Sequence, residues 1–257
     1  MTVAKKFYVV WEGRQKGVFT DWDACKRQVD QFAGARYKSF KTRAEAEAAL
    51  RGGPGSAAAK AKPAPSKKYA GKGPKTHTAD EINALDVQTK IFTDGGCEPN
   101  PGKAASGVAV YRDGQLSELR YGLFNPQGTN NTAELNALHQ ALLMAEKEIE
   151  SKATVAIFCD SKYSIQCVTQ WAAGWEKKGW KKRDGEIKNL ELIQAMFALY
   201  KTLKGKVQVL HVNGHVGVEG NELADRMSIH GIDTREESFA SFEVPDSLKE
   251  VLAMRTG

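Results

Sequence analysis

Four carboxylates in the second half of the chain stand where acids could hold metal ions. Asp94 and Asp160 each close an apolar run that is predicted to be a strand, whereas Glu134 and Asp225 lie in predicted helices. Acids at strand ends fall where α/β sheets place their ligands. Carboxylate oxygens hold Mg²⁺, and two such ions about 4 Å apart can bind the attacking and leaving oxygens of a phosphodiester displacement. The four acids together therefore predict a metal-dependent nuclease.

Each acid taken alone also has an ordinary structural explanation. An Asp after a strand is commonly a turn or helix cap, and Glu134 could complete a capping box with Asn131. However, Glu134 shares a helical face with apolar residues such as Leu138, and a buried unpaired charge is costly. Glu222 and Asp225, three residues apart on one helix, repel each other unless a cation lies nearby. The set favours a shared cation more strongly than any single acid does.

Composition limits the class of protein. The 257 residues suffice for one large or two modest domains, and 41% are hydrophobic. We expect no membrane association, because no apolar run approaches the roughly 20 residues that span a bilayer, and no signal peptide, because the start of the chain, Met1 to Lys6, has no long apolar segment. Four cysteines without CxxC spacing predict reduced thiols and a cytoplasmic location. A pI near 9.0 suggests a polyanionic partner.

The composition changes along the chain and predicts four segments. Residues 1–52 form a small module with 11 Lys and Arg against 6 acids. Residues 53–85 begin with a run rich in Pro, Gly, Ala and Lys, which cannot bury enough apolar surface to fold and predicts a flexible basic linker. Residues 86–235 form the larger domain. Residues 236–257, with 5 acids and 2 bases, are predicted to be a loose acidic tail.

Periodicity and turn signals predict an α/β chain. The first module reads as strand, strand, helix, strand, helix: 7–11, 17–19, 22–32, 36–40 and 42–50. In the larger domain the predicted strands are 87–93, 106–112, 116–124, 154–159 and 207–212, and the predicted helices are 132–149, 161–171, 187–203 and 221–230. Hairpins followed by strand–helix alternation indicate a mixed sheet flanked by helices.

The stretches around the four acids resemble type 1 ribonuclease H across residues 87–233. The matching stretches are 92–96, 129–134, 159–161, 179–181, 212–215 and 220–225. The resemblance implies a mixed five-stranded sheet and hydrolysis of the RNA strand of RNA–DNA hybrids, leaving 5′-phosphate and 3′-hydroxyl ends. It also implies that the four acids hold two Mg²⁺ ions, with Mn²⁺ as the alternative. One ion would activate water and the other would stabilise the leaving 3′ oxygen.

The same resemblance assigns further residues. It makes His215 a group that assists proton movement and product release, and Glu222 an auxiliary acid near the metals. The positions that match RNA-strand contacts are Asn100, Asn130 and Asn131. Those that match DNA-strand contacts are Thr129 and Asn189, which grip a phosphate, and Trp171. The implied partner is an RNA–DNA hybrid bound by a monomer.

The N-terminal module resembles the hybrid-binding domain that precedes some type 1 ribonucleases H. The likeness covers the stretches 7–10, 17–19 and 36–40, and implies that Trp22, Tyr37 and Lys38 meet the hybrid. Aromatic rings stack on exposed bases, and Lys neutralises phosphate. The structural alternative is that Trp22 anchors the core of the module.

Two other functions fit part of the pattern. A catalytically inactive hybrid-binding protein would share the fold, but would be expected to lack one of the four acids. An integrase-like enzyme acting on DNA would share the metal site, but not the hybrid-binding module or the residues matched to the 2′-hydroxyl.

Overall fold

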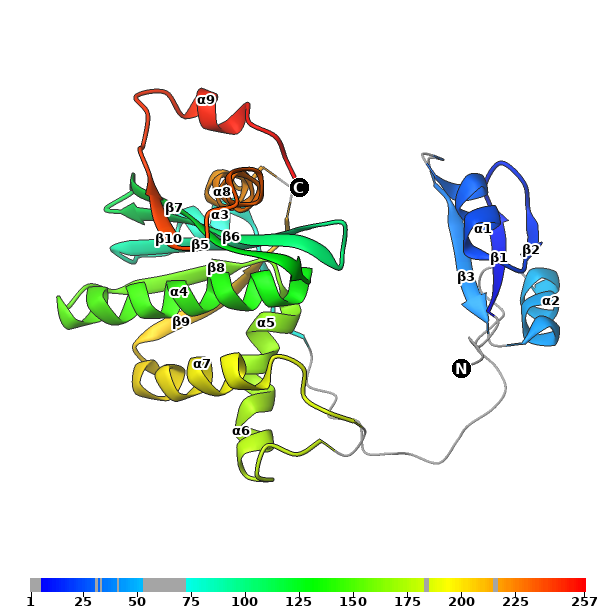
Figure 1. The fold of residues 1–257 in the computed structure, drawn as a ribbon, viewed down its shortest axis with the longest axis horizontal. Helices are drawn as coiled ribbons and strands as arrows, with labels where there is room; N and C mark the ends of the chain where they lie inside the picture. Colours follow the sequence, from blue (N-terminus) through cyan, green and yellow to red (C-terminus); the bar gives the residue numbers. More distant parts are fainter. Residues whose placement is uncertain are drawn as a thin grey trace. The chain divides into compact units, whose positions relative to one another are not determined.

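The computed structural model describes residues 6–30, 32, 34–40, 42–52, 73–182, 185–214 and 217–257. It separates the chain into two compact units, Met1–Ala70 and Gly71–Gly257 (Figure 1). Most of the predicted linker lies outside the described residues. Among the helices that the structure describes, none has the length and apolar composition needed to cross a membrane.

The N-terminal unit is a three-stranded antiparallel sheet with the order β2-β1-β3 and two helices. Its elements are β1 (Phe7–Glu12), β2 (Gly17–Phe19), α1 (Trp22–Val29), β3 (Arg36–Phe40) and α2 (Arg43–Gly52), in the predicted order. The Asp21 side chain accepts a hydrogen bond from Ala24 N and caps α1. Strand alternation sends Val9 towards α2 and Val10 towards α1, so each face of the sheet has a small core.

The second unit is built on a seven-stranded sheet with the order β10-β7-β6-β5-β8-β9-β4. The strands are β4 (Thr76–His77), β5 (Thr89–Glu98), β6 (Gly102–Arg112), β7 (Gln115–Gly128), β8 (Val155–Cys159), β9 (Val207–Val212) and β10 (Phe239–Phe242). Pairings from β10 to β5 are antiparallel, and those from β5 to β4 are parallel. The five predicted strands form the centre of this mixed sheet, and β4 and β10 extend its two edges.

Helices cover both faces of this sheet (Figure 1). They are α3 (Ala79–Asn83), α4 (Asn130–Glu150), α5 (Lys162–Gln166), α6 (Ala172–Glu176), α7 (Leu190–Leu203), α8 (Glu219–Thr234) and α9 (Leu248–Leu252). One core lies between the sheet and α4 and α7, and a second lies on the α8 face. Strand β8 is buried throughout because both of its faces are covered. The predicted helix 161–171 is instead α5 followed by a π-helical turn, Cys167–Trp171, leading into α6.

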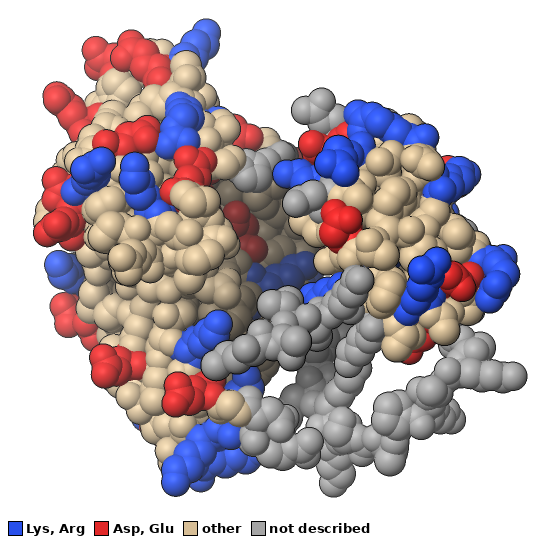
Figure 2. Space-filling model, turned by 45° about the vertical axis from the view of Figure 1, so that its right-hand side comes forward, with Lys and Arg blue, Asp and Glu red and all other residues tan. Residues whose placement is uncertain are grey.

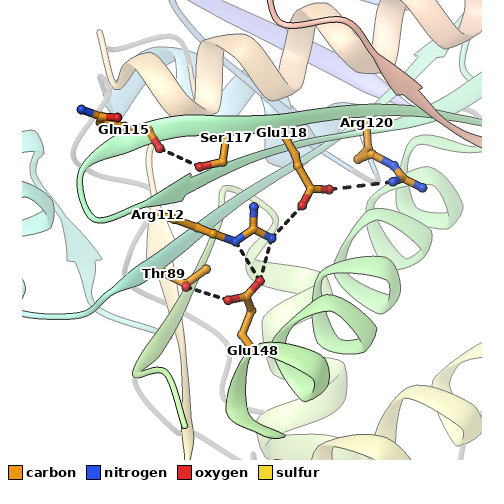
Figure 3. Close-up of polar contacts among 7 residues, drawn as sticks. All are labelled: Thr89, Arg112, Gln115, Ser117, Glu118, Arg120 and Glu148. Atoms are coloured by element: carbon orange, nitrogen blue, oxygen red, sulfur yellow. Dashed lines mark hydrogen bonds and ion pairs between the residues drawn. The ribbon is translucent and has the colours of Figure 1, made fainter. Parts of the chain in front are cut away.

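A polar network joins three strands to α4 (Figure 3). The guanidinium of Arg112 on β6 forms ion pairs with Glu148 of α4 at 2.6 Å and Glu118 of β7 at 2.7 Å. Thr89 of β5 donates a hydrogen bond to the same Glu148 carboxylate. Glu148 of α4 is thus bound by side chains from two strands, and these contacts hold α4, which carries Glu134, in place against the sheet.

Both ends of the second unit extend beyond the predicted boundaries of 86 and 235. Residues 76–83 contain β4 and α3, and Ile82 of α3 is buried in the core. Residues 236–257 are not loose: β10 pairs with β7, and Val251 of α9 is buried. The prediction rested on charge alone, which does not reveal that a few apolar side chains among the acids can bind a sheet edge.

Candidate active site

The four predicted metal ligands converge from four elements. Asp94 lies on β5, Glu134 near the start of α4, Asp160 directly after β8 and Asp225 in α8. Asp160 is at a strand end, as predicted. Asp94 is not, because β5 continues to Glu98 through cross-strand pairing with β6. The sheet thus holds Asp94 on a rigid strand.

Two glycines allow the helices to approach Asp94 closely. A Cβ at Gly95 would lie 2.2 Å from the backbone nitrogen of Glu134, and a Cβ at Gly107 would lie 2.1 Å from the carbonyl oxygen of Ala224. Gly107 is the cross-strand partner of Asp94. Only glycine can occupy these two positions while α4 and α8 remain in place. The absence of a side chain at both positions allows the helices, and the acids that they carry, to lie close to β5.

The site is strongly negative and largely buried. Asp94, Glu134 and Asp225 are 7%, 5% and 3% exposed. Burial raises the pKa of Asp94 well above its usual range, and the charges of Asp160 and Asp225 raise it further. Burial, followed by the charges of Asp94 and Asp160, likewise raises the pKa of Glu134. Such crowding favours the protonated, neutral form of the carboxyl groups unless a nearby cation stabilises the ionised form.

The donor set fits a hard divalent cation. Glu134 Oε2 is buried and has no hydrogen-bond partner among the residues that the structure describes. A buried acceptor of this kind is expected to meet an ion or water. Ligand atoms of Glu134, Asp160 and Cys159 lie within 4.8 Å of one another. The predominance of carboxylate oxygen suits Mg²⁺ or Mn²⁺.

Three residues at this site were not found by sequence reasoning. Cys159 was predicted only to be a reduced thiol. In the structure its Sγ lies within 4.8 Å of ligand atoms of Glu134 and Asp160. Arg226 is buried beside Asp225, and its Nη1 pairs with Asp225 Oδ2. His211 of β9 places Nε2 3.0 Å from the carbonyl oxygen of Asp160 and Nδ1 2.8 Å from Thr76 Oγ1, which connects β4 to the active site.

Glu222 contacts the loop that precedes α8. Glu222 Oε1 accepts a hydrogen bond from Gly217 N at 3.1 Å, which ties α8 to the loop before it. His215 lies outside the described residues and its role stays a prediction. Its neighbour Gly214 passes beside Asp160, since a Cβ there would lie 2.8 Å from Asp160 Oδ2. The chain therefore reaches the acids one residue before His215.

The predicted substrate contacts form two groups at the start of α4. Asn100 Oδ1 accepts a hydrogen bond from Asn130 N at 3.3 Å, beside Asn131 in the first turn. Thr129 caps the helix. Its hydroxyl lies 2.8 Å from that of Thr132, which in turn donates to Asn189 Oδ1 at 3.0 Å. The structure thus brings Thr129 and Asn189 into one hydrogen-bonded chain.

Aromatic residues lie on both units. Trp171 is partly buried, with its ring centroid 6.1 Å from Tyr163 and 5.8 Å from Trp175. In the N-terminal unit Trp22 is 42% exposed and Tyr37 is 47% exposed, with ring centroids 5.8 Å apart. Trp22 is therefore a surface residue and not a core anchor. Lys38 is exposed but lies over the Phe40 ring, on the opposite face of β3 from Tyr37.

Both parts of the chain are similar to known proteins. The ribonuclease H family profile matches residues 86–233, and the profile of the ribonuclease H1 N-terminal domain matches residues 6–50. Ribonuclease H1 of Mus musculus is 32% identical over 90% of this chain and 90% of its own length. Ribonuclease H1 of Homo sapiens is 31% identical over 90% of this chain and 91% of its own.

Bacterial relatives match the second unit. Ribonuclease H of an Acidovorax strain is 38% identical over 57% of this chain and 95% of its own length. Among solved structures, the type 1 ribonuclease H called LC9-RNase H1 is 25% identical, with a TM-score of 0.49, and the match covers 65% of this chain and 81% of that one. From the two profiles and the near full-length relatives, we conclude that this chain belongs to the ribonuclease H family and carries the N-terminal domain found in ribonucleases H1.

Proposed function

We propose that this ribonuclease H cuts the RNA strand of RNA–DNA hybrids at the site formed by Asp94, Glu134, Asp160 and Asp225, leaving 5′-phosphate and 3′-hydroxyl ends. The observation that carries the assignment to this site is the burial of like charges around an unpaired Glu134 oxygen. Burial of this kind is costly without a cation. Family membership supports the reaction, and the burial and crowding of the four acids support their proposed role in it.

The four acids would hold two Mg²⁺ ions, with Mn²⁺ as an alternative. Bound metal supplies an activated water and charge stabilisation at the leaving 3′ oxygen. Asp94 lies between the helices that carry Glu134 and Asp225, so its carboxylate would take part in holding both ions. The buried walls keep the carboxylates oriented and strengthen their interaction with a cation.

Substrate strands would be distinguished at the start of α4. Asn100, Asn130 and Asn131 offer amide donors and acceptors to RNA 2′-hydroxyls, the groups that distinguish RNA from DNA. Thr129 and Asn189 would bind a phosphate of the DNA strand, where the helix N-terminus also favours an anion. Trp171 would contact the DNA strand through the part of its ring that remains exposed.

Proton handling would fall to the loop before α8. His215 would assist proton movement and release of the product, since the chain passes Asp160 at Gly214. Glu222 would be an auxiliary acid that also holds this loop through Gly217 N. In this proposal His215 and Glu222 would lie beside the metal ligands but would not bind the metal themselves.

The N-terminal unit would increase affinity for the hybrid. Trp22 and Tyr37 present adjacent exposed rings for stacking, and Lys38 would reach a phosphate from the edge strand. Lys and Arg side chains are prominent on the visible face of this unit, the smaller one at the right of Figure 2. Tethering to the catalytic unit would raise the effective concentration of the hybrid.

The enzyme is proposed to act as a cytoplasmic monomer. All four cysteines are described as free thiols, which suits a reducing compartment. Light scattering of the purified protein would measure the mass, and a dimer would contradict this part of the proposal.

The test is cleavage of an end-labelled RNA–DNA hybrid, beside double-stranded RNA and double-stranded DNA, by the wild type and Asp94→Asn. We expect the wild type to cut only the RNA of the hybrid and the variant to bind without cutting, because an amide cannot replace the shared carboxylate. Variant turnover within tenfold of the wild type in Mg²⁺ would contradict the assignment.

A further inference from the structure

The C-terminal segment, residues 236–257, ends beside a metal ligand. The backbone N–H of Gly257 donates a hydrogen bond to Asp225 Oδ1 at 3.2 Å. The other carboxylate oxygen, Oδ2, pairs with Arg226. Each carboxylate oxygen has two lone pairs, so both oxygens can accept these hydrogen bonds and still face a cation.

Arg255 anchors this end of the segment to two elements. Its guanidinium pairs with Asp233 of α8 at 2.7 Å and with Glu98 at the end of β5. Asp225, Ile229 and Asp233 recur at four-residue intervals, and hence share one face of α8. A Cβ at Gly257 would lie 2.9 Å from Asp225 and 3.2 Å from Ile229. Residues 255–257 thus follow this face from Asp233 to Asp225.

The rest of the segment is held independently. Val251 of α9 is buried in the α8-side core, and β10 is paired with β7. Arg226 Nε also donates to the carbonyl oxygen of Leu252 at 3.4 Å. The segment therefore touches Asp225 directly through Gly257 and indirectly through Arg226. The segment is thus held at β10, at α9 and at residues 255–257.

We propose that Arg255 is a positioning residue, which holds the Gly257 N–H against Asp225 and so orients that carboxylate for metal binding. Hydrogen bonds to metal-binding carboxylates fix their direction, and losing such a partner typically costs 10- to 100-fold in metal affinity or activity. The Gly257 N–H that meets Asp225 is an uncharged donor, so its effect on the carboxylate is one of orientation. This inference rests on the proposed metal site.

The experiment compares Arg255→Ala, Arg255→Lys and Gly257→Pro with the wild type in the full chain. Proline removes the N–H donor without removing the residue. Metal binding is measured by calorimetry without substrate, and hybrid cleavage is measured as a function of Mg²⁺ concentration. We expect Arg255→Ala and Gly257→Pro to raise the half-saturating Mg²⁺ concentration about tenfold. The KM for hybrid should not change, and Arg255→Lys should fall between the wild type and Arg255→Ala.

Lys201→Ala is the matched control. Its ion pair with Glu176 has a distance of 2.7 Å and side-chain exposures of 48% and 43%, close to the 45% and 43% of Arg255 and Glu98. This pair joins α7 and α6, so its loss should leave metal activation unchanged. Melting temperatures of all variants separate loss of folding from loss of metal binding.

Asp225→Asn in the same assays separates the two proposals. If Asp225→Asn keeps wild-type metal activation, the proposed metal site is wrong. If Asp225→Asn loses activation while folded Arg255→Ala and Gly257→Pro bind metal as the wild type does, only the positioning role is wrong. Tighter metal binding in these two variants would also overturn it, because the segment would then compete with the cation.

Discussion

Gly95→Ala should separate assembly of the site from its chemistry. The added Cβ would lie 2.2 Å from the backbone nitrogen of Glu134, whereas ordinary contacts begin near 3.4 Å. The start of α4 must therefore retreat by about 1 Å, and the neighbouring backbone cannot rotate away as a side chain could. No catalytic side chain is removed.

The expected magnitude follows from this displacement. Misplacing a catalytic group by about 1 Å can cost roughly 10²-fold in rate, and overpacking typically costs about 1–3 kcal/mol of stability. For a unit of this size, about 1 kcal/mol lowers the melting temperature by roughly 2–4 °C. Gly95→Ala should thus remain folded while its kcat for hybrid cleavage falls about 10²-fold.

The assay is steady-state cleavage of a labelled hybrid at saturating Mg²⁺, together with thermal unfolding. Gly174→Ala is the matched control, because a Cβ at that position in α6 meets nothing within 4 Å. It should retain wild-type kcat and stability. A Gly95→Ala enzyme with wild-type kcat and melting temperature would refute the argument that close packing at β5 places Glu134.

Three further outcomes follow from the site and the N-terminal unit. The raised pKa of Glu134 means that the folded, metal-free protein binds this proton more tightly than the unfolded chain does, so stability should fall as pH rises above the ordinary carboxyl pKa of 4.5. Chemical denaturation with and without Mg²⁺ would measure this, and Glu134→Gln should flatten the slope. His215→Ala should slow turnover by about 10²- to 10⁴-fold, and inactivity equal to that of Asp94→Asn would contradict its role. Deleting residues 1–52, which carry 11 basic and 6 acidic residues, should weaken hybrid binding and flatten its salt dependence. Trp22→Ala should weaken binding without changing that slope, and unaltered affinity in both variants would exclude hybrid binding by this unit.

The sequence predicts best where the signal is local. The apolar run of β8 places Asp160 at a strand end, and helical periodicity places Glu134 near the start of α4. Asp94 was wrongly expected at a strand end, because it closes an apolar run and Gly95-Gly96 follows it. In the fold these glycines pair with Ser106 and Ala105 on β6 and continue the strand. Pairing across strands overrides the local preference.

The sequence predicts least where distant segments meet. Thr76 and His211 are 135 residues apart, yet their hydrogen bond joins β4 to the edge of the sheet. Residues 236–257 were predicted to be an acidic tail from their charge. Val251 is nevertheless buried, because it packs into the core on the α8 face, which is formed by residues distant in the sequence. Neither contact leaves a periodic pattern, so neither could be predicted from one sequence.

The candidate site shows why the acids can be recognised while their arrangement cannot. Asp94 and Glu134 stand out because a carboxylate on an apolar strand or helix face violates the usual pattern of burial. What brings them together is close packing through Gly95 and Gly107. Burial, and after it the neighbouring like charges, raises the pKa values of Asp94 and Glu134. Such packing of like charges opposes stability, and in the proposed site a bound cation would offset this cost. The buried acids and the two glycines therefore break local sequence rules for one reason, the proposed function.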